Sequence, residues 1–146
     1  MITAQDVETV LNHYNSSLKG NGQDLVNVAT AAKLNPAMML AIIQKESSYG
    51  KGGDLHKANP FSIHFRTRGQ LQKNEKPIDM LRPSPGTLPT FKQSAAAAAN
   101  TLNKLAAANN KQPFSSVASK YSEKPQEWKT DINKFYLGIL RRVGKL

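Results

Sequence analysis

The sequence predicts a mainly α fold of α+β character, in which helices surround a buried central helix and a small irregular or β lobe is inserted between them. Three observations support this prediction: apolar residues recur at helical spacing near both ends, residues 37–43 are all apolar, and prolines and glycines interrupt residues 51–91. The chain has 146 residues, the size of one ordinary domain. We therefore expect a single domain over residues 1–146, with the irregular lobe at about 51–91.

Two helices are expected before the central one. Thr3 and Asp6 have the spacing of a capping box, and helical spacing of apolar residues then continues to the glycines within residues 20–22. Asp24 is expected to cap the second helix, which runs to Leu34.

The central helix is expected to begin with Asn35 as its cap and Pro36 in its first turn. Its unbroken apolar run predicts burial on all sides. The helix ends in Glu46, and the nearby glycines at 50, 52 and 53 let the backbone leave sharply, which opens room for a ligand beside the carboxylate. Desolvation there would raise the pKa of Glu46, as a general acid requires near neutral pH. A solvated glutamate in a last helical turn is the alternative, and position alone leaves both open.

The lobe over residues 51–91 shows no helical period. Only Phe61, Ile63 and Phe65 alternate as a short strand would. Turns and a hairpin are therefore expected in this lobe.

Helices are expected again after the lobe. Ser94 is expected to cap an alanine-rich helix that continues to residues 109–110, and a short helix follows at 117–121. The last helix carries an apolar stripe that includes Trp128, which we assign to the core rather than to a cleft.

Composition excludes several kinds of chemistry. The sequence has no cysteine, which excludes disulfides and thiolate catalysis, and its three histidines lack ligand spacing, so neither a metal nor another cofactor is expected. No histidine context supports a catalytic serine. No segment has the length of a membrane span, and the N-terminal residues lack the profile of a signal peptide, so the chain is expected to be soluble and made in the cytoplasm.

The net charge is +10, from 20 Lys and Arg against 10 Asp and Glu. This balance favours a polyanionic partner, which could be nucleic acid, an anionic membrane or an anionic cell wall, and simple solubility is the plainer reading. No helix combines its basic residues with base-reading side chains in a recognisable motif, so no nucleic-acid partner is expected. The basic last helix could lie on an anionic cell-envelope surface, or could simply pack with a solvated basic face.

Two segments of the sequence resemble a known group of enzymes. Residues 34–50 read LNPAMMLAIIQKESSYG and residues 58–63 read ANPFSI. They resemble the lysozyme-like peptidoglycan glycosidases, in particular the lytic transglycosylases and the N-acetylglucosaminidases of the autolysin or flagellar type. A looser resemblance extends over residues 25–137. The Gly-Leu-Met-Gln stretch of the transglycosylases is absent, Ser62 stands where the glucosaminidases usually have glycine, and their tyrosine-rich motif is not clear around residues 121–123.

The resemblance implies roles for individual residues. Glu46 would be the proton donor to the glycosidic oxygen. Asn59, Phe61 and Tyr121 have side chains suited to binding N-acetylated sugars, and Ser47 would contribute to the same site by holding its backbone. Phe61 is equally compatible with a plain core position.

Glycoside hydrolysis generally uses a second carboxylate. Glu75 is the candidate, because it falls in the lobe where this family sometimes carries its second acid, and Asp79 and Asp54 are rivals. A turn residue neutralised by neighbouring lysines is the other reading of Glu75. In these families the substrate's N-acetyl group or a tyrosine can also replace the second carboxylate.

These expectations combine into one functional hypothesis. The chain is expected to be a monomeric peptidoglycan hydrolase of the N-acetylglucosaminidase, muramidase or lytic transglycosylase type, with Glu46 as general acid and the glycan strand as its partner. A bacteriophage lysin fits best, released through a holin-type membrane lesion or carried on the virion. The alternatives are a non-catalytic glycan-binding or phage structural protein of the same fold and, more remotely, a nucleic-acid-binding protein.

Overall fold

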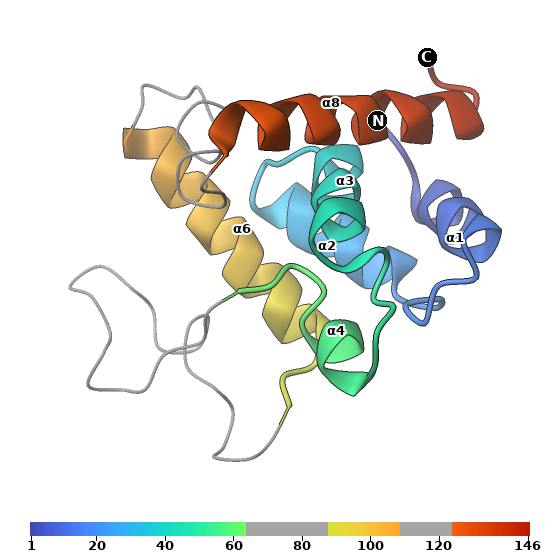
Figure 1. The fold of residues 1–146 in the computed structure, drawn as a ribbon, viewed down its shortest axis with the longest axis horizontal. Coiled ribbons are helices and arrows are strands. Elements are labelled where there is room, and N and C mark those ends of the chain that lie inside the picture. The colour runs from blue at the N-terminus through green and yellow to red at the C-terminus, as the bar shows by residue number, and fades with distance from the viewer. Residues whose placement is uncertain (64–87, 109–123) are drawn as a thin grey trace.

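The computed structural model describes residues 1–63, 88–108 and 124–146, with side chains of residues 104–108 and 125 left aside. Within these ranges the chain is mainly helical, as predicted, and no strand is present. The helices are α1 (Ala4–His13), α2 (Gly22–Ala31), α3 (Pro36–Ser47), α4 (Asp54–Ala58), α6 (Phe91–Ala108) and α8 (Pro125–Arg142) (Figure 1). In the described part of the chain, no helix is both long and apolar enough to cross a membrane.

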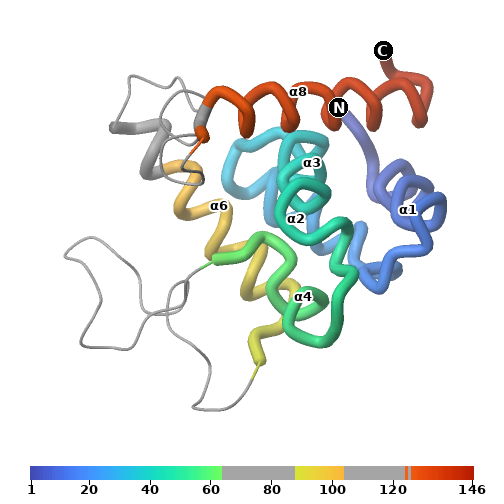
Figure 2. The backbone as a smooth tube through the Cα atoms, viewed as in Figure 1, coloured from blue at the N-terminus to red at the C-terminus, as the bar shows by residue number. Residues whose placement is uncertain are grey.

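Helix α3 is the central helix of the fold. Residues from Pro36 to Ile43 are all buried, which confirms the prediction from the apolar run. Helix α3 packs against α8 and α2, while α2 also contacts α1 and α6. In the backbone trace, α3 accordingly lies in the middle of the other helices, with α8 running across its upper end (Figure 2).

Two predicted helix starts are confirmed. Thr3 and Asp6 form the capping box: the backbone N–H of Thr3 donates to the Asp6 carboxylate at 2.8 Å, and the N–H of Asp6 donates to the Thr3 hydroxyl at 3.1 Å. The Asn35 side chain accepts a 2.9 Å hydrogen bond from the N–H of Ala37, and Pro36 occupies the first turn.

The predicted cap of the second helix is wrong. Helix α2 begins at Gly22 with Asn21 at its cap position, and Asp24 lies within its first turn. The carboxylate of Glu8, from α1, accepts hydrogen bonds from the N–H groups of Gly20 at 2.7 Å and Gly22 at 3.0 Å. An acceptor on another helix thus replaces the local cap.

The start of the alanine-rich helix is also earlier than predicted. Helix α6 begins at Phe91, preceded by a reciprocal pair in which Thr90 and Gln93 bond each other's backbone N–H groups at 2.8 and 3.1 Å. Ser94 lies inside the helix, and its buried hydroxyl donates to the carbonyl oxygen of Ala58 at 2.6 Å. It therefore fastens α4 to α6 instead of capping.

The expected strand does not begin at residues 61–63. The backbone there forms a turn in which Ser62 has a φ of 54°, outside the extended region. Phe65, the rest of the lobe up to residue 87 and the helix expected at 117–121 lie outside the described residues.

Candidate functional site

The candidate site lies at the C-terminal end of α3, where Glu46 occupies the last turn. Directly after the helix, Ser48, Tyr49 and Gly50 all have positive φ, of 48°, 62° and 77°. Three successive residues in the left-handed region turn the chain away from the helix axis. This turn ends α3 at Ser47, directly after Glu46.

Hydrogen bonds from the segment after α1 hold this turn. The buried hydroxyl of Ser16 donates to the carbonyl oxygen of Tyr49 at 2.7 Å, and Ser17 donates to that of Gly50 at 2.9 Å. A side chain at position 50 would approach within 2.9 Å of the Leu18 Cγ, so close packing as well as the positive φ requires glycine there. These contacts fix the backbone of Tyr49 and Gly50, directly after the end of the helix that carries Glu46.

The carboxyl group of Glu46 is half-buried against α8. The indole N–H of Trp128 donates to Glu46 Oε1 at 2.9 Å, and the indole itself is buried. Burial raises the pKa of Glu46 above its usual value, and this effect outweighs the hydrogen bond from Trp128 and the positive charge of Lys45, which both lower the pKa. Glu46 is thus held closer to its protonated form than an ordinary surface glutamate.

An ion pair lies beside Glu46. Lys45 Nζ is 2.6 Å from Asp131 Oδ2, and both side chains are about 30% exposed. Asp131 raises the pKa of Lys45, which keeps the ammonium charged. Helix α3 therefore presents two adjacent charged side chains to α8, and each meets a different partner on that helix.

The arrangement is suited to proton donation. Trp128 occupies Oε1, and none of the described residues donates a hydrogen bond to Oε2. A carboxyl group with a raised pKa and one free oxygen can carry a proton and release it to a bound acceptor. In the described part of the chain, no cluster of three histidine, aspartate or glutamate side chains could hold a metal ion.

Ser47 was predicted to contribute to substrate binding, but it is buried and turned inward. Its hydroxyl donates to the carbonyl oxygen of Ile43 at 3.0 Å and accepts from the N–H of Gly50 at 3.0 Å. Ser47 thus holds the backbone at the end of α3 and leaves no exposed group for a sugar.

Asn59 and Phe61 also serve the fold. The Asn59 side chain donates to the carbonyl oxygen of Ile63 at 2.8 Å and accepts from its N–H at 3.1 Å, so both ends of the amide close the turn over residues 59–63. Phe61 is 0% exposed and lies near the ring of Phe91. Of the two expected roles of Phe61, the structure shows the core position, in which no ring face is open to a ligand.

Of the remaining predicted residues, only Asp54 lies within the described part of the chain. Glu75, its rival Asp79 and Tyr121 lie outside the described residues. Asp54 lies in the first turn of the exposed helix α4.

Sequence reasoning missed the role of Trp128 and of the Lys45–Asp131 pair. A tryptophan in an apolar stripe still needs an acceptor for its N–H once it is buried, and that requirement was the available signal for the bond to Glu46. Nothing in the local sequence could pair Lys45 with Asp131, which is 86 residues away.

Comparison of the chain with protein-family models, with characterised proteins and with solved structures gives no match.

Proposed function

We propose that the protein is a glycosidase of lysozyme-like fold that cleaves the glycan strand of bacterial peptidoglycan, with Glu46 as its general acid. The observation that supports this best is the half-buried Glu46 carboxyl, which has a raised pKa and bonds the indole of Trp128 through one oxygen only. A glutamic acid in an apolar setting beside a tryptophan is also how lysozyme keeps its acid protonated. The likeness of residues 34–50 to this group of enzymes gives the substrate class.

In this mechanism the proton of Glu46 passes to the glycosidic oxygen as the bond from that oxygen to the anomeric carbon breaks. The bond's electron pair stays with the departing oxygen, and the sugar left behind develops oxocarbenium character. Glu46 becomes a carboxylate beside Lys45, whose ammonium stabilises the new charge. The anomeric carbon is then captured by water or by a group of the substrate itself.

The test uses purified peptidoglycan and a pair of matched variants. Glu46→Gln keeps the size of the side chain and an acceptor for Trp128 but cannot donate a carboxyl proton, so release of muropeptides should fall about 10²–10⁴-fold. Glu127→Gln removes an exposed glutamate from α8 and should leave release unchanged. Mass spectrometry of the new chain ends identifies the activity: N-acetylglucosamine, N-acetylmuramic acid or anhydromuramic acid ends correspond to the three types.

Full muropeptide release by a correctly folded Glu46→Gln variant would contradict the proposal. The fold of each variant is checked by near-ultraviolet circular dichroism, since Trp128 and Tyr49 are buried aromatic side chains that report on packing.

A second candidate is a lysozyme-like module that binds glycan without cleaving it. The net charge of +10 favours association with an anionic wall whether or not the glycan is cut. Co-sedimentation with wall material that yields no new chain ends would support this candidate. In either form we propose that the protein acts on the wall after release through a membrane lesion or as part of a virion.

A further inference from the structure

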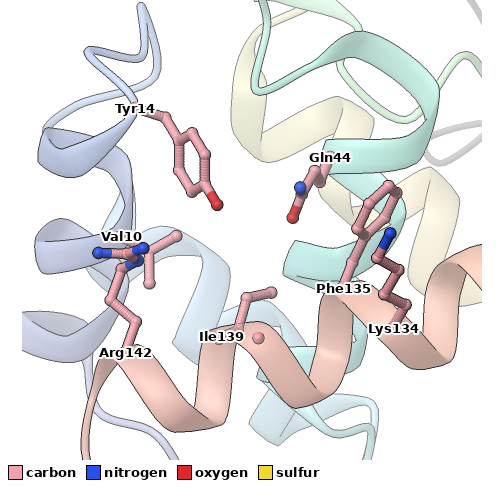
Figure 3. Close-up of a pocket in the computed structure, with 8 residues that line it drawn as sticks. Val10, Tyr14, Gln44, Lys134, Phe135, Ile139 and Arg142 are labelled. Carbon is pink, nitrogen blue, oxygen red and sulfur yellow. The ribbon is translucent and has the colours of Figure 1, made fainter.

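A pocket of about 210 Å³ lies between α1, α3 and α8, and neither Glu46 nor Trp128 lines it. Its walls come from Val10 on α1, Tyr14 directly after α1, Gln44 on α3 and the second half of α8 (Figure 3). Given the roughly 30 Å³ that a water molecule takes up in the liquid, the space holds on the order of seven waters. It is suited to a ligand smaller than a drug-sized molecule.

The floor of the pocket is apolar. Val10 and Ile139 are buried core residues, and Phe135 packs partly against the same core. Gly138 lies between Phe135 and Ile139 in the second half of α8, and a Cβ built there would meet no atom within 4 Å. A glycine inside a helix costs about 1 kcal/mol relative to alanine. Because packing does not require this glycine, its effect is to leave the pocket wider.

The rim carries hydrogen-bond donors. The hydroxyl of Tyr14 and the amide of Gln44 point toward one another across the opening (Figure 3). Gln44 Oε1 already accepts the hydroxyl of Tyr49 at 2.6 Å. No described residue accepts from the amide nitrogen of Gln44, so its N–H groups are available to a ligand.

Two cations flank the pocket. Arg142 lies over the Tyr14 ring, 5.8 Å from its centroid, and one guanidinium N–H donates to His13 Nδ1 at 3.1 Å. That leaves further N–H groups of Arg142, and Lys134 lies at the other end of the pocket (Figure 3). Among the described residues, no carboxylate pairs with Arg142 or Lys134. The rim is thus positive and rich in donors.

We propose that this pocket binds a small organic carboxylate with a short apolar body. The carboxylate would accept hydrogen bonds from Arg142 and Gln44, with Lys134 adding charge, while the body rests on Phe135 and Ile139. Such a group exists both as a free metabolite and as the C-terminus of a wall peptide, and the chemistry recognised is the same. The site does not depend on the chemistry at Glu46.

The test follows the backbone amide signals of Gly138 and Gln44 by NMR in the full-length protein. N-acetyl-D-alanine should shift both signals saturably, whereas its C-terminal amide, which has the same body without the charge, should bind at least about tenfold more weakly. Inorganic phosphate is an anion without an apolar body, so it tests whether charge alone gives binding. It should bind more weakly than the acid. A muropeptide ending in a free carboxylate forms the last arm: tighter binding than N-acetyl-D-alanine assigns the ligand to the wall, and equal affinity assigns it to free carboxylates.

Matched variants localise the binding. Arg142→Gln should weaken N-acetyl-D-alanine at least about tenfold, whereas Arg141→Gln removes the same charge from the adjacent, exposed position outside the pocket and should leave affinity within about twofold. Gly138→Leu should abolish binding by filling the space, and leucine is a better helix former than glycine. Glu46→Gln should bind as the wild type does, which separates this site from the proposed catalytic function.

The proposal would be overturned by an absence of saturable shifts at Gly138 and Gln44, by equal affinity for the acid and its amide, or by equal losses in Arg142→Gln and Arg141→Gln. Phosphate binding more tightly than N-acetyl-D-alanine would overturn the assignment to a carboxylate.

Discussion

Glu46 experiences opposing electrostatic effects. Removing its carboxylate from water disfavours the charged form, while the indole N–H of Trp128 and the ammonium of Lys45 favour it. Burial is the largest of these effects, so the pKa rises. The charge of Glu46 is consequently a cost to the fold at neutral pH.

This cost predicts a pH-dependent effect of Glu46→Gln on stability. Between the usual pKa of 4.5 and the raised folded value, the folded state binds more protons than the unfolded state, so the wild type loses stability as pH rises through this interval. The glutamine variant has no such proton and should be more stable than the wild type above the interval. Thermal unfolding across pH measures the difference.

Well below pH 4.5 the carboxyl group is protonated in both states, and the two proteins should then differ much less. A stability difference that did not change with pH would mean that burial does not raise the pKa of Glu46.

Trp128→Phe tests how much the indole N–H lowers the pKa of Glu46. The variant keeps an aromatic ring but removes the N–H donor that favours the carboxylate, so the pKa of Glu46 should rise further. A ¹³C NMR titration of the Glu46 carboxyl group measures it. Tyr136→Phe is the control, since it removes a hydroxyl on the same helix that bonds Asn35 and not Glu46. A lower pKa in Trp128→Phe would show that the indole acts mainly by excluding water, contrary to this expectation.

The sequence located Glu46 but not its surroundings. A carboxylate that ends an apolar helix before a glycine-rich turn is a local pattern, and it could be recognised without a structure. The tryptophan that bonds its carboxyl group comes from α8, 82 residues later in the chain. The inward orientation of Asn59 and Phe61 likewise depends on the turn they close, which the expected strand pattern did not indicate.

At the scale of elements, the turn after α3 stores backbone strain. Ser48 and Tyr49 are not glycines, yet both have positive φ. Ser48→Gly should stabilise the protein by about 0.5–1 kcal/mol. Glycine adopts a positive φ without strain, and this gain is only partly offset by the larger conformational entropy that glycine loses on folding. Chemical denaturation measures the free energy of unfolding.

Gly50→Ala is the reciprocal change in the same turn. It places a Cβ 2.9 Å from the Leu18 Cγ at a φ of 77° and should destabilise by more than about 1 kcal/mol. Stabilisation by this change would show that the turn is not fixed as described.

Helix starts illustrate which elements the sequence could predict. The capping box of Thr3 and Asp6 and the Asn35–Pro36 start depend on residues within one turn, and both are confirmed. Asp24 and Ser94 were assigned as caps by the same reasoning and are not, because Glu8 reaches α2 from α1 and Ser94 bonds the carbonyl of Ala58. Local rules fail where another element supplies the partner.

At the scale of the whole molecule, the α3–α8 interface joins the candidate site to the core. Ile132, one turn after Trp128 on α8, is 0% exposed. Ile132→Ala should cost about 2–5 kcal/mol through lost burial and a cavity, whereas Leu55→Ala, at a position 61% exposed, should change stability by less than about 0.5 kcal/mol. Denaturant unfolding gives both values, and similar values for the two would contradict the assignment of this interface to the core.

The net charge of +10 predicts salt-dependent binding to anionic wall polymers. Screening shortens the reach of exposed charges, so raising salt from about 0.05 M to about 0.5 M should weaken association at least about tenfold. Co-sedimentation with isolated wall measures it, with the Glu46→Gln variant used so that the wall stays intact. Wall whose carboxylates have been amidated is the control and should bind weakly at both salt concentrations. Binding that does not change with salt concentration would instead indicate that uncharged contacts with the sugars hold the protein on the wall. The net positive charge would then have no part in its attachment.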